Sequence, residues 1–148
     1  MTLAIRPARP GEEPALSELA LRSKGHWGHD AAFLERARPE LTVDPEHLGR
    51  WIVRVAERDG AVVGFSAVDP EAGELEMLFV DPAAIGTGVG RALLIDALTA
   101  ARMAGLEALL IESDPDAEPF YRLHGAEPAG TRTSWSTGRE LPLLRIST

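Results

Sequence analysis

The sequence predicts a single α+β domain that spans residues 1–148, with a mixed central sheet of about seven strands and helices on both faces. Three observations support this fold class. The length of 148 residues fits one domain. Apolar residues recur with a period of two over residues 51–80, which is typical of strands, and with a period near 3.6 over residues 88–104, which is typical of a helix.

The N-terminal third predicts one strand followed by two helices. Residues 2–7 form a short strand that ends at a proline, and apolar residues then recur at helical spacing through about residue 23. A glycine-punctuated break over residues 24–29 follows. Asp30 is suited to cap a second helix, which we expect to stop before Pro39 because the residue ahead of a proline disfavours helix.

The middle of the chain predicts three antiparallel strands. The strands 51–58 and 61–68 are joined by an Asp-Gly pair, which is a hairpin signature, and a turn over residues 69–73 leads to the third strand, 74–80. The remaining predicted elements are a helix over 88–104, strands over 106–112, 127–135 and 140–146, and a short helix over 117–124.

Composition excludes several classes of protein. The chain has no cysteine, which rules out disulfides, thiolate metal sites and cysteine nucleophiles. Its 15 basic and 23 acidic residues give a net charge of −8, which argues against nucleic-acid binding and mildly favours cationic partners. No apolar run approaches the ~20 residues that span a membrane, and no signal peptide is visible. We therefore expect a cytoplasmic protein that binds neither nucleic acid nor membrane.

A strand, a glycine-rich loop and a helix follow one another over residues 78–94. Gly86, Gly88 and Gly90 stand at alternate positions, and glycine lets backbone approach a ligand closely. The first amides of a helix are unpaired and lie at its positive end, so the segment predicts a phosphate site and not merely a flexible loop. Neither common nucleotide loop matches. A Walker loop needs a lysine here, and a Rossmann fingerprint needs glycine in place of Arg91.

This segment resembles the GCN5-related N-acetyltransferase (GNAT) family, whose motif Gln/Arg-x-x-Gly-x-Gly/Ala follows a strand ending in hydrophobic-x-Val-x-Pro. Residues 78–82 and 88–90 match, whereas Ile85 stands where the family has Gln or Arg. Residues 111–126 resemble the family's later segment, Asn/Asp-x-x-Ala-x-x-Phe-Tyr-x-x-x-Gly-Phe/Ala, with Asp114 where Asn is common. The order of elements resembles the family over nearly the whole chain.

The resemblance implies an N-acetyltransferase that moves an acetyl group from acetyl-coenzyme A (acetyl-CoA) to a primary amine by direct attack on the thioester. In such a fold the loop amides hold the pyrophosphate, and the pantetheine arm lies between two splayed strands that end near Val80 and Glu112. The implied cofactor-binding residues are Leu78, Phe79, Val80, Ile85, Gly86, Thr87, Gly88, Val89, Gly90, Arg91, Asp114, Ala117 and Tyr121.

Three residues are candidates for the proton transfers. Tyr121 occupies the family's position for protonating the departing thiolate, and the alternative is a core tyrosine packed beside Phe120. Glu74 and Glu76 share one face of their strand if side chains alternate with a period of two. Either is then a candidate base, directly or through water. The alternative for this pair is two solvated carboxylates on an exposed face.

The acceptor is expected to be an amine on a small molecule or a peptide. His26, Trp27 and Trp135 are candidate acceptor contacts, because the loop between the first two helices lines the acceptor pocket in similar folds. No metal is expected, since His26, His29 and Asp30 are too few to form a metal site.

Two further readings accompany this hypothesis. A non-catalytic acyl-CoA-binding or sensing module would keep the glycine loop and need neither base nor acid. The apolar run within residues 140–146 also suggests a homodimer contact.

Overall fold

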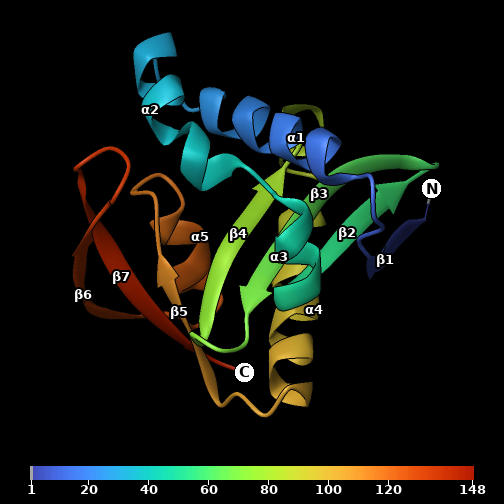
Figure 1. Ribbon diagram of the computed structural model, residues 1–148. Coiled ribbons are helices and arrows are strands. Elements are labelled where there is room, and N and C mark those ends of the chain that lie inside the picture. Colours follow the sequence, from blue (N-terminus) through green and yellow to red (C-terminus); the bar gives the residue numbers. More distant parts are fainter. Residues whose placement is uncertain (1) are drawn as a thin grey trace.

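Seven strands form one sheet in the order β1-β2-β3-β4-β5-β7-β6 in the computed structural model, which describes residues 2–148 (Figure 1). Only β4 and β5 are parallel, so the predicted mixed seven-stranded sheet is confirmed. The elements are β1 (Leu3–Pro7), α1 (Glu13–Gly25), α2 (Ala31–Leu41), α3 (Pro45–Arg50), β2 (Ile52–Arg58), β3 (Ala61–Asp69), β4 (Glu74–Val80), the 3₁₀ helix η1 (Pro82–Ala84), α4 (Val89–Met103), β5 (Ala108–Glu112), α5 (Glu118–Leu123), β6 (Glu127–Thr133) and β7 (Glu140–Ser147).

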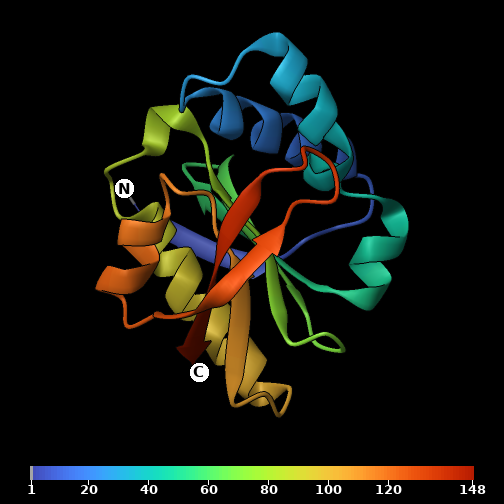
Figure 2. The ribbon, with the colours of Figure 1, turned by 90° about the vertical axis from the view of Figure 1, so that its left-hand side faces the viewer.

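Helices cover both faces of the sheet. Figure 2 shows α4 and α5 on one side of the strands and α3 on the other, while the turn between β6 and β7 reaches up to α2. On the α1 side, Leu16 and Leu19 pack against Phe65 of β3, and on the α4 side Leu94 packs with Leu109 of β5. The apolar stripe of each helix therefore buries itself on the sheet, as its period predicts.

The strands β4 and β5 pair at a single position. Their one register pair joins Glu74 to Leu110, next to a 2.9 Å hydrogen bond from the Leu110 amide to the Gly73 carbonyl. Beyond this point the two strands diverge (Figure 1), and toward Val80 the edge of β4 opposite β3 has no strand beside it. The sheet is therefore open in its middle, at the carboxyl ends of β4 and β5.

Two local expectations about helices differ from the structure. The helix α2 does not stop before Pro39 but continues to Leu41, because Ala37 and Leu41 are both buried in the core and their packing outweighs the local cost of the proline. The helix α3 was not predicted, since six residues are too few to show a period. Its start carries a local signal nonetheless, an aspartate N-cap followed by Pro45 at the first turn.

The expected dimer contact through residues 140–146 stays a prediction, and the structure limits how these residues could make it. The strand β7 pairs with β5 on one side and β6 on the other, so it offers no free edge to a second copy. Its apolar residues Leu141, Leu144 and Ile146 are buried in this chain's own core. Within residues 2–148, none of the helices has the length and apolar character needed to cross a membrane.

Candidate active site

A β-bulge in β4 places Glu76. The register joins Ala67 of β3 to Met77 and the next residue, Val68, to Leu75, so Glu76 has no partner on β3. A bulge of this kind interrupts the alternation of side chains along a strand. Strand alternation therefore does not explain why Glu74 and Glu76 lie together. Both side chains nonetheless line the same cavity.

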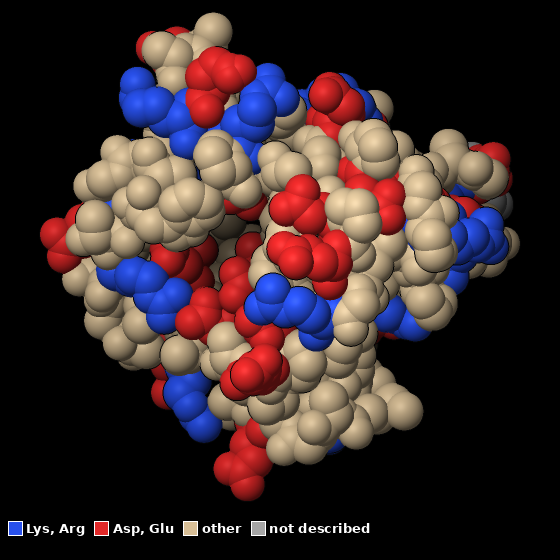
Figure 3. Space-filling view, in the orientation of Figure 1, with Lys and Arg blue, Asp and Glu red and all other residues tan. Residues whose placement is uncertain are grey.

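Two adjoining cavities open beside this bulge. The larger has a volume of about 830 Å³ and the smaller about 130 Å³. Figure 3 shows the corresponding face of the molecule hollowed near its centre, with acidic side chains around the hollow. The residues that line both cavities are Lys24, Leu75, Glu76, Met77, Phe79 and Glu112.

The two candidate bases differ in their partners. Both carboxylate oxygens of Glu74 accept hydrogen bonds from the Arg132 guanidinium, at 3.0 and 3.1 Å. Glu76 has no such partner among the described residues and is open to solvent within the hollow. The surrounding protein nonetheless desolvates it, and this desolvation, followed by the nearby Glu74 carboxylate, raises the pKa of Glu76 to about 7. Glu76 is thus the group suited to exchange protons near neutral pH.

Tyr121 borders the smaller cavity from α5. Its side chain is 6% exposed, and its ring packs edge-on against Phe120 at a centroid distance of 5.3 Å. Among residues 2–148, no group accepts a hydrogen bond from its hydroxyl. Burial raises the pKa of the Tyr121 phenol well above its usual value near 10, so the phenol keeps its proton at neutral pH.

The glycine loop presents unpaired amides beyond the end of β4. Gly88 is the N-cap of α4, with a φ of +90°, and its carbonyl accepts the first helical hydrogen bond from Ala92. The amides of residues 89–91 therefore lack partners within the helix. A Cβ on Gly88 would meet no protein atom within 4 Å, so the space beside these amides is open. The amides of Ile85 and Thr87 instead donate to the turn carbonyls of Pro82 and Ala84.

A basic residue from outside the sequence motif also contacts this loop. The Arg58 guanidinium, at the end of β2, donates to the Thr87 hydroxyl at 3.0 Å. Arg58 thus joins Arg91 as a basic residue of the loop region. The Val89 side chain, by contrast, is buried in the core, so this residue offers a ligand only its backbone.

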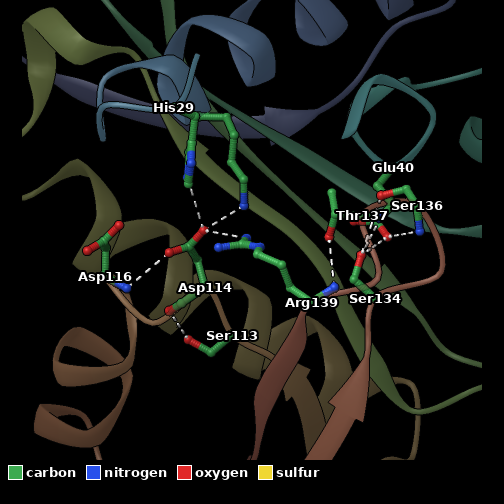
Figure 4. Close-up of polar contacts among 10 residues, drawn as sticks. His29, Glu40, Ser113, Asp114, Asp116, Ser134, Ser136, Thr137 and Arg139 are labelled. Atoms are coloured by element: carbon green, nitrogen blue, oxygen red, sulfur yellow. Dashed lines mark hydrogen bonds and ion pairs between the residues drawn. The ribbon is translucent and has the colours of Figure 1, made fainter. Parts of the chain in front are cut away.

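Asp114 gathers three basic side chains at the end of β5 (Figure 4). Its Oδ2 lies 2.7 Å from Lys24 Nζ, 3.3 Å from an Arg139 guanidinium nitrogen and 3.6 Å from His29 Nε2. Burial alone would raise the pKa of Asp114, but hydrogen bonds from Lys24, the Asp116 amide and Arg139 hold it well below its usual range. His29, Asp114 and Asp116 lie close enough to share an ion. Lys24 and Arg139 already neutralise Asp114, so this cluster does not fit a metal.

The structure brings together only some of the expected site residues. Leu78, Phe79, Asp114, Ala117 and Tyr121 all line the smaller cavity, whereas Val80 and the loop residues 85–91 line neither. Of the three candidate acceptor contacts, Trp135 lines the larger cavity, Trp27 lines the smaller one, and His26 is exposed with its ring edge-on to Trp27, outside both. Sequence reasoning missed Glu40, Asp44, His47, Trp51 and Arg132, which all line the larger cavity.

Comparison with known proteins identifies the family. The family described as the "Acetyltransferase (GNAT) domain" matches residues 24–134, which is most of the chain. The chain therefore belongs to the GNAT acetyltransferase family, in agreement with the splayed strands and the loop before α4.

Individual relatives resemble the chain either in part of the sequence or in the whole fold. A mycothiol acetyltransferase of Thermomonospora curvata is 40% identical over 73 residues, which cover 47% of this chain but only 25% of that protein. A GCN5-related N-acetyltransferase structure from Rhodopseudomonas palustris superposes with a TM-score of 0.85 at 20% identity, covering 100% of this chain and 97% of the other. The PaiA N-acetyltransferase of Thermoplasma acidophilum, solved with coenzyme A, gives a TM-score of 0.82 at 18% identity over the whole of both chains. At these identities the two structures establish the fold alone.

Proposed function

We propose that the protein is an N-acetyltransferase that moves an acetyl group from acetyl-CoA to a primary amine of a small molecule or peptide. One observation carries the proposal. The smaller cavity, between the splayed strands, and the larger acidic cavity meet at Glu76. A base of pKa about 7 thus stands where a bound thioester and an amine would meet.

The chain's own groups fit acetyl-CoA as a co-substrate. The free amides of residues 89–91, at the positive end of α4, suit the pyrophosphate, with Arg58 and Arg91 adding charge. The unpaired edge of β4 from Leu78 to Val80 offers backbone groups to the amides of the pantetheine arm. When bound, acetyl-CoA supplies a thioester carbonyl that an unprotonated amine attacks, with the thiolate as the leaving group.

Two side chains would move the protons. Glu76 accepts the proton of the incoming ammonium, directly or through water, because its carboxylate is unpaired and its pKa lies near neutrality. Glu74, paired with Arg132, lines the larger cavity together with Glu76. Tyr121 donates a proton to the departing sulfur, since its buried phenol faces the smaller cavity and stays protonated. A backbone amide of the free β4 edge polarises the thioester oxygen.

A panel of primary amines tests the proposal. We expect free thiol to appear only when acetyl-CoA and a suitable amine are both present, with a matching mass increase of the amine. Saturable binding of acetyl-CoA without turnover on any amine would instead identify the non-catalytic acyl-CoA-binding module. The chain's membership in the GNAT acetyltransferase family and the position of Glu76 favour the enzyme over the non-catalytic module.

A further inference from the structure

Part of the larger cavity extends away from the junction with the smaller one. We call it the distal arm and define it by five of the residues that line the larger cavity but not the smaller one: Glu40, Asp44, His47, Trp51 and Trp135. A volume of about 830 Å³ far exceeds what a single amino group needs and falls in the range of cavities that hold whole small molecules. The distal arm therefore has room for the rest of an acceptor.

The cations of the larger cavity are already paired. Lys24 Nζ lies 2.7 Å from Asp114, and the Arg132 guanidinium lies 3.0 Å from Glu74 and 3.6 Å from Glu112. An acceptor carboxylate would therefore find no free cation along this wall. It would lie instead among carboxylates and lose its water of solvation without a partner, which is costly.

Unlike these cations, the Glu40 carboxylate has no partner of opposite charge among the described residues. Its Oε1 accepts hydrogen bonds from the Ser134 hydroxyl at 2.8 Å and from the Ser136 amide at 3.2 Å, and both donors are neutral. Its Oε2 has no hydrogen-bond or ion-pair partner within residues 2–148. The charge of Glu40 also acts on the neighbouring Glu112 carboxylate. Burial first, and then the Glu40 carboxylate, raises the pKa of Glu112.

The Glu40 carboxylate is held in place before any ligand binds. Figure 4 shows Ser134 and Ser136 of the β6–β7 turn directed at Glu40, while Arg139 at the other end of the same turn contacts Asp114. Both ends of the turn are thus fixed, so little ordering remains to oppose ligand binding. In the same cavity, the rings of His47 and Trp51 stack at a centroid distance of 4.0 Å with an interplanar angle of 2°, and they form an aromatic wall for an alkyl chain.

We propose that the acceptor carries a second cationic group, which the Glu40 carboxylate binds while the amine to be acetylated lies at Glu76. The substrate class is a short diamine or a similar dication without a carboxylate. This inference rests on the proposed acetyl transfer and adds the specificity of the same cavity. Glu40 acts here as a specificity-determining residue.

The test compares three acceptors of equal chain length: an alkyl monoamine, the α,ω-diamine and the ω-amino acid, over three to six carbons. We expect the wild-type kcat/KM to favour the diamine over the monoamine by about tenfold, as a charge-assisted contact would give, and to be lowest for the amino acid. This preference should shrink as ionic strength rises. Glu40→Gln keeps an oxygen for Ser134 and Ser136 but removes the charge, so kcat/KM for the diamine should fall about tenfold and the preference over the monoamine should vanish.

Glu46→Gln is the matched control, because Glu46 is an exposed carboxylate on α3 that lines neither cavity. It should leave the diamine preference unchanged. Equal use of monoamine and diamine by the wild type, or an unchanged preference in Glu40→Gln, overturns the inference while acetyl transfer stands. Failure to acetylate any amine overturns the proposed function instead. In that event calorimetry of the diamine with the CoA-loaded protein still decides, since weaker binding to Glu40→Gln supports the inference and equal binding overturns it.

Discussion

Leu75 and Met77 are only two residues apart on β4, yet they pack on opposite sides of the sheet. Leu75 belongs to the core beneath α4, whereas Met77 belongs to the core beneath α1. In a regular strand both would face the same side. The bulge at Glu76 reverses the alternation and leaves Glu76 free of the ladder at the junction of the two cavities. The strand β4 thus lacks one pairing with β3, at the position where the Glu76 carboxylate lines both cavities.

The first prediction concerns this carboxylate. Glu76 titrates near pH 7. Because a base must be deprotonated, kcat/KM for the amine should fall as pH drops through about 7 and reach a plateau above it. Glu76→Gln should lower turnover by about 10²-fold and remove this limb of the pH profile. Steady-state kinetics from pH 5 to 9 provide the measurement.

Glu71→Gln serves as the control for this experiment, since Glu71 is exposed on the turn before β4 and lines neither cavity. It should keep both the rate and the pH profile. A pH profile of Glu76→Gln that still bends near 7 would assign the limb to another group.

The glycine loop gives a second prediction, in which two glycines at opposite ends of α4 are compared. Gly88 and Gly105 have nearly the same φ, +90° and +91°, and a Cβ on either meets no protein atom within 4 Å. Alanine at either position should therefore cost about 1 kcal/mol of folding stability through backbone strain. Only Gly88→Ala places a methyl group beside the free amides of α4, so only this variant should lose acetyl-CoA binding by calorimetry. Equal affinities of the two variants would remove the loop from the cofactor site.

The fold and the glycine loop that precedes α4 could be predicted because their signals are local. Periodicity identifies strands and helices within a few residues, and the glycine spacing lies within one segment. The acceptor side is built from contacts that no local pattern contains. The pair of Lys24 and Asp114 spans 90 positions, and the bulge at Glu76 exists only through the register with β3. The Asp44–Pro45 start of α3 is a local signal for one part of the distal arm.

A third prediction concerns the stability that Asp114 provides. Because its folded-state pKa lies below the unfolded value near 4, the stabilisation is complete above pH 4 and is lost as pH falls toward the folded pKa. Asp114→Asn leaves Lys24 and Arg139 without their anion. At pH 7 we expect a loss of about 2 kcal/mol, or roughly 6 °C in Tm. The difference from wild type should shrink below pH 4.

Asp116→Asn controls for the loss of a charge at nearly the same place, because the Asp116 side chain is exposed and its hydrogen bond to Asp114 comes from its backbone amide, which the substitution keeps. Its Tm should match that of the wild type at both pH values. If Asp114→Asn and Asp116→Asn melted alike, the ion pairs of Asp114 would contribute nothing measurable.

The last prediction concerns the hydroxyl of Tyr121. Within residues 2–148 this hydroxyl donates to no protein group, while the ring packs on Phe120 and the side chain borders the smaller cavity. Tyr121→Phe keeps the ring and removes only the donor, so Tm and acetyl-CoA affinity should remain near the wild-type values. Turnover should fall by about 10²-fold, at the low end of general-acid contributions, because the departing thiolate loses its proton source. A core tyrosine with no chemical role would give the opposite pattern, with turnover above half of wild type, and water would then have to protonate the sulfur.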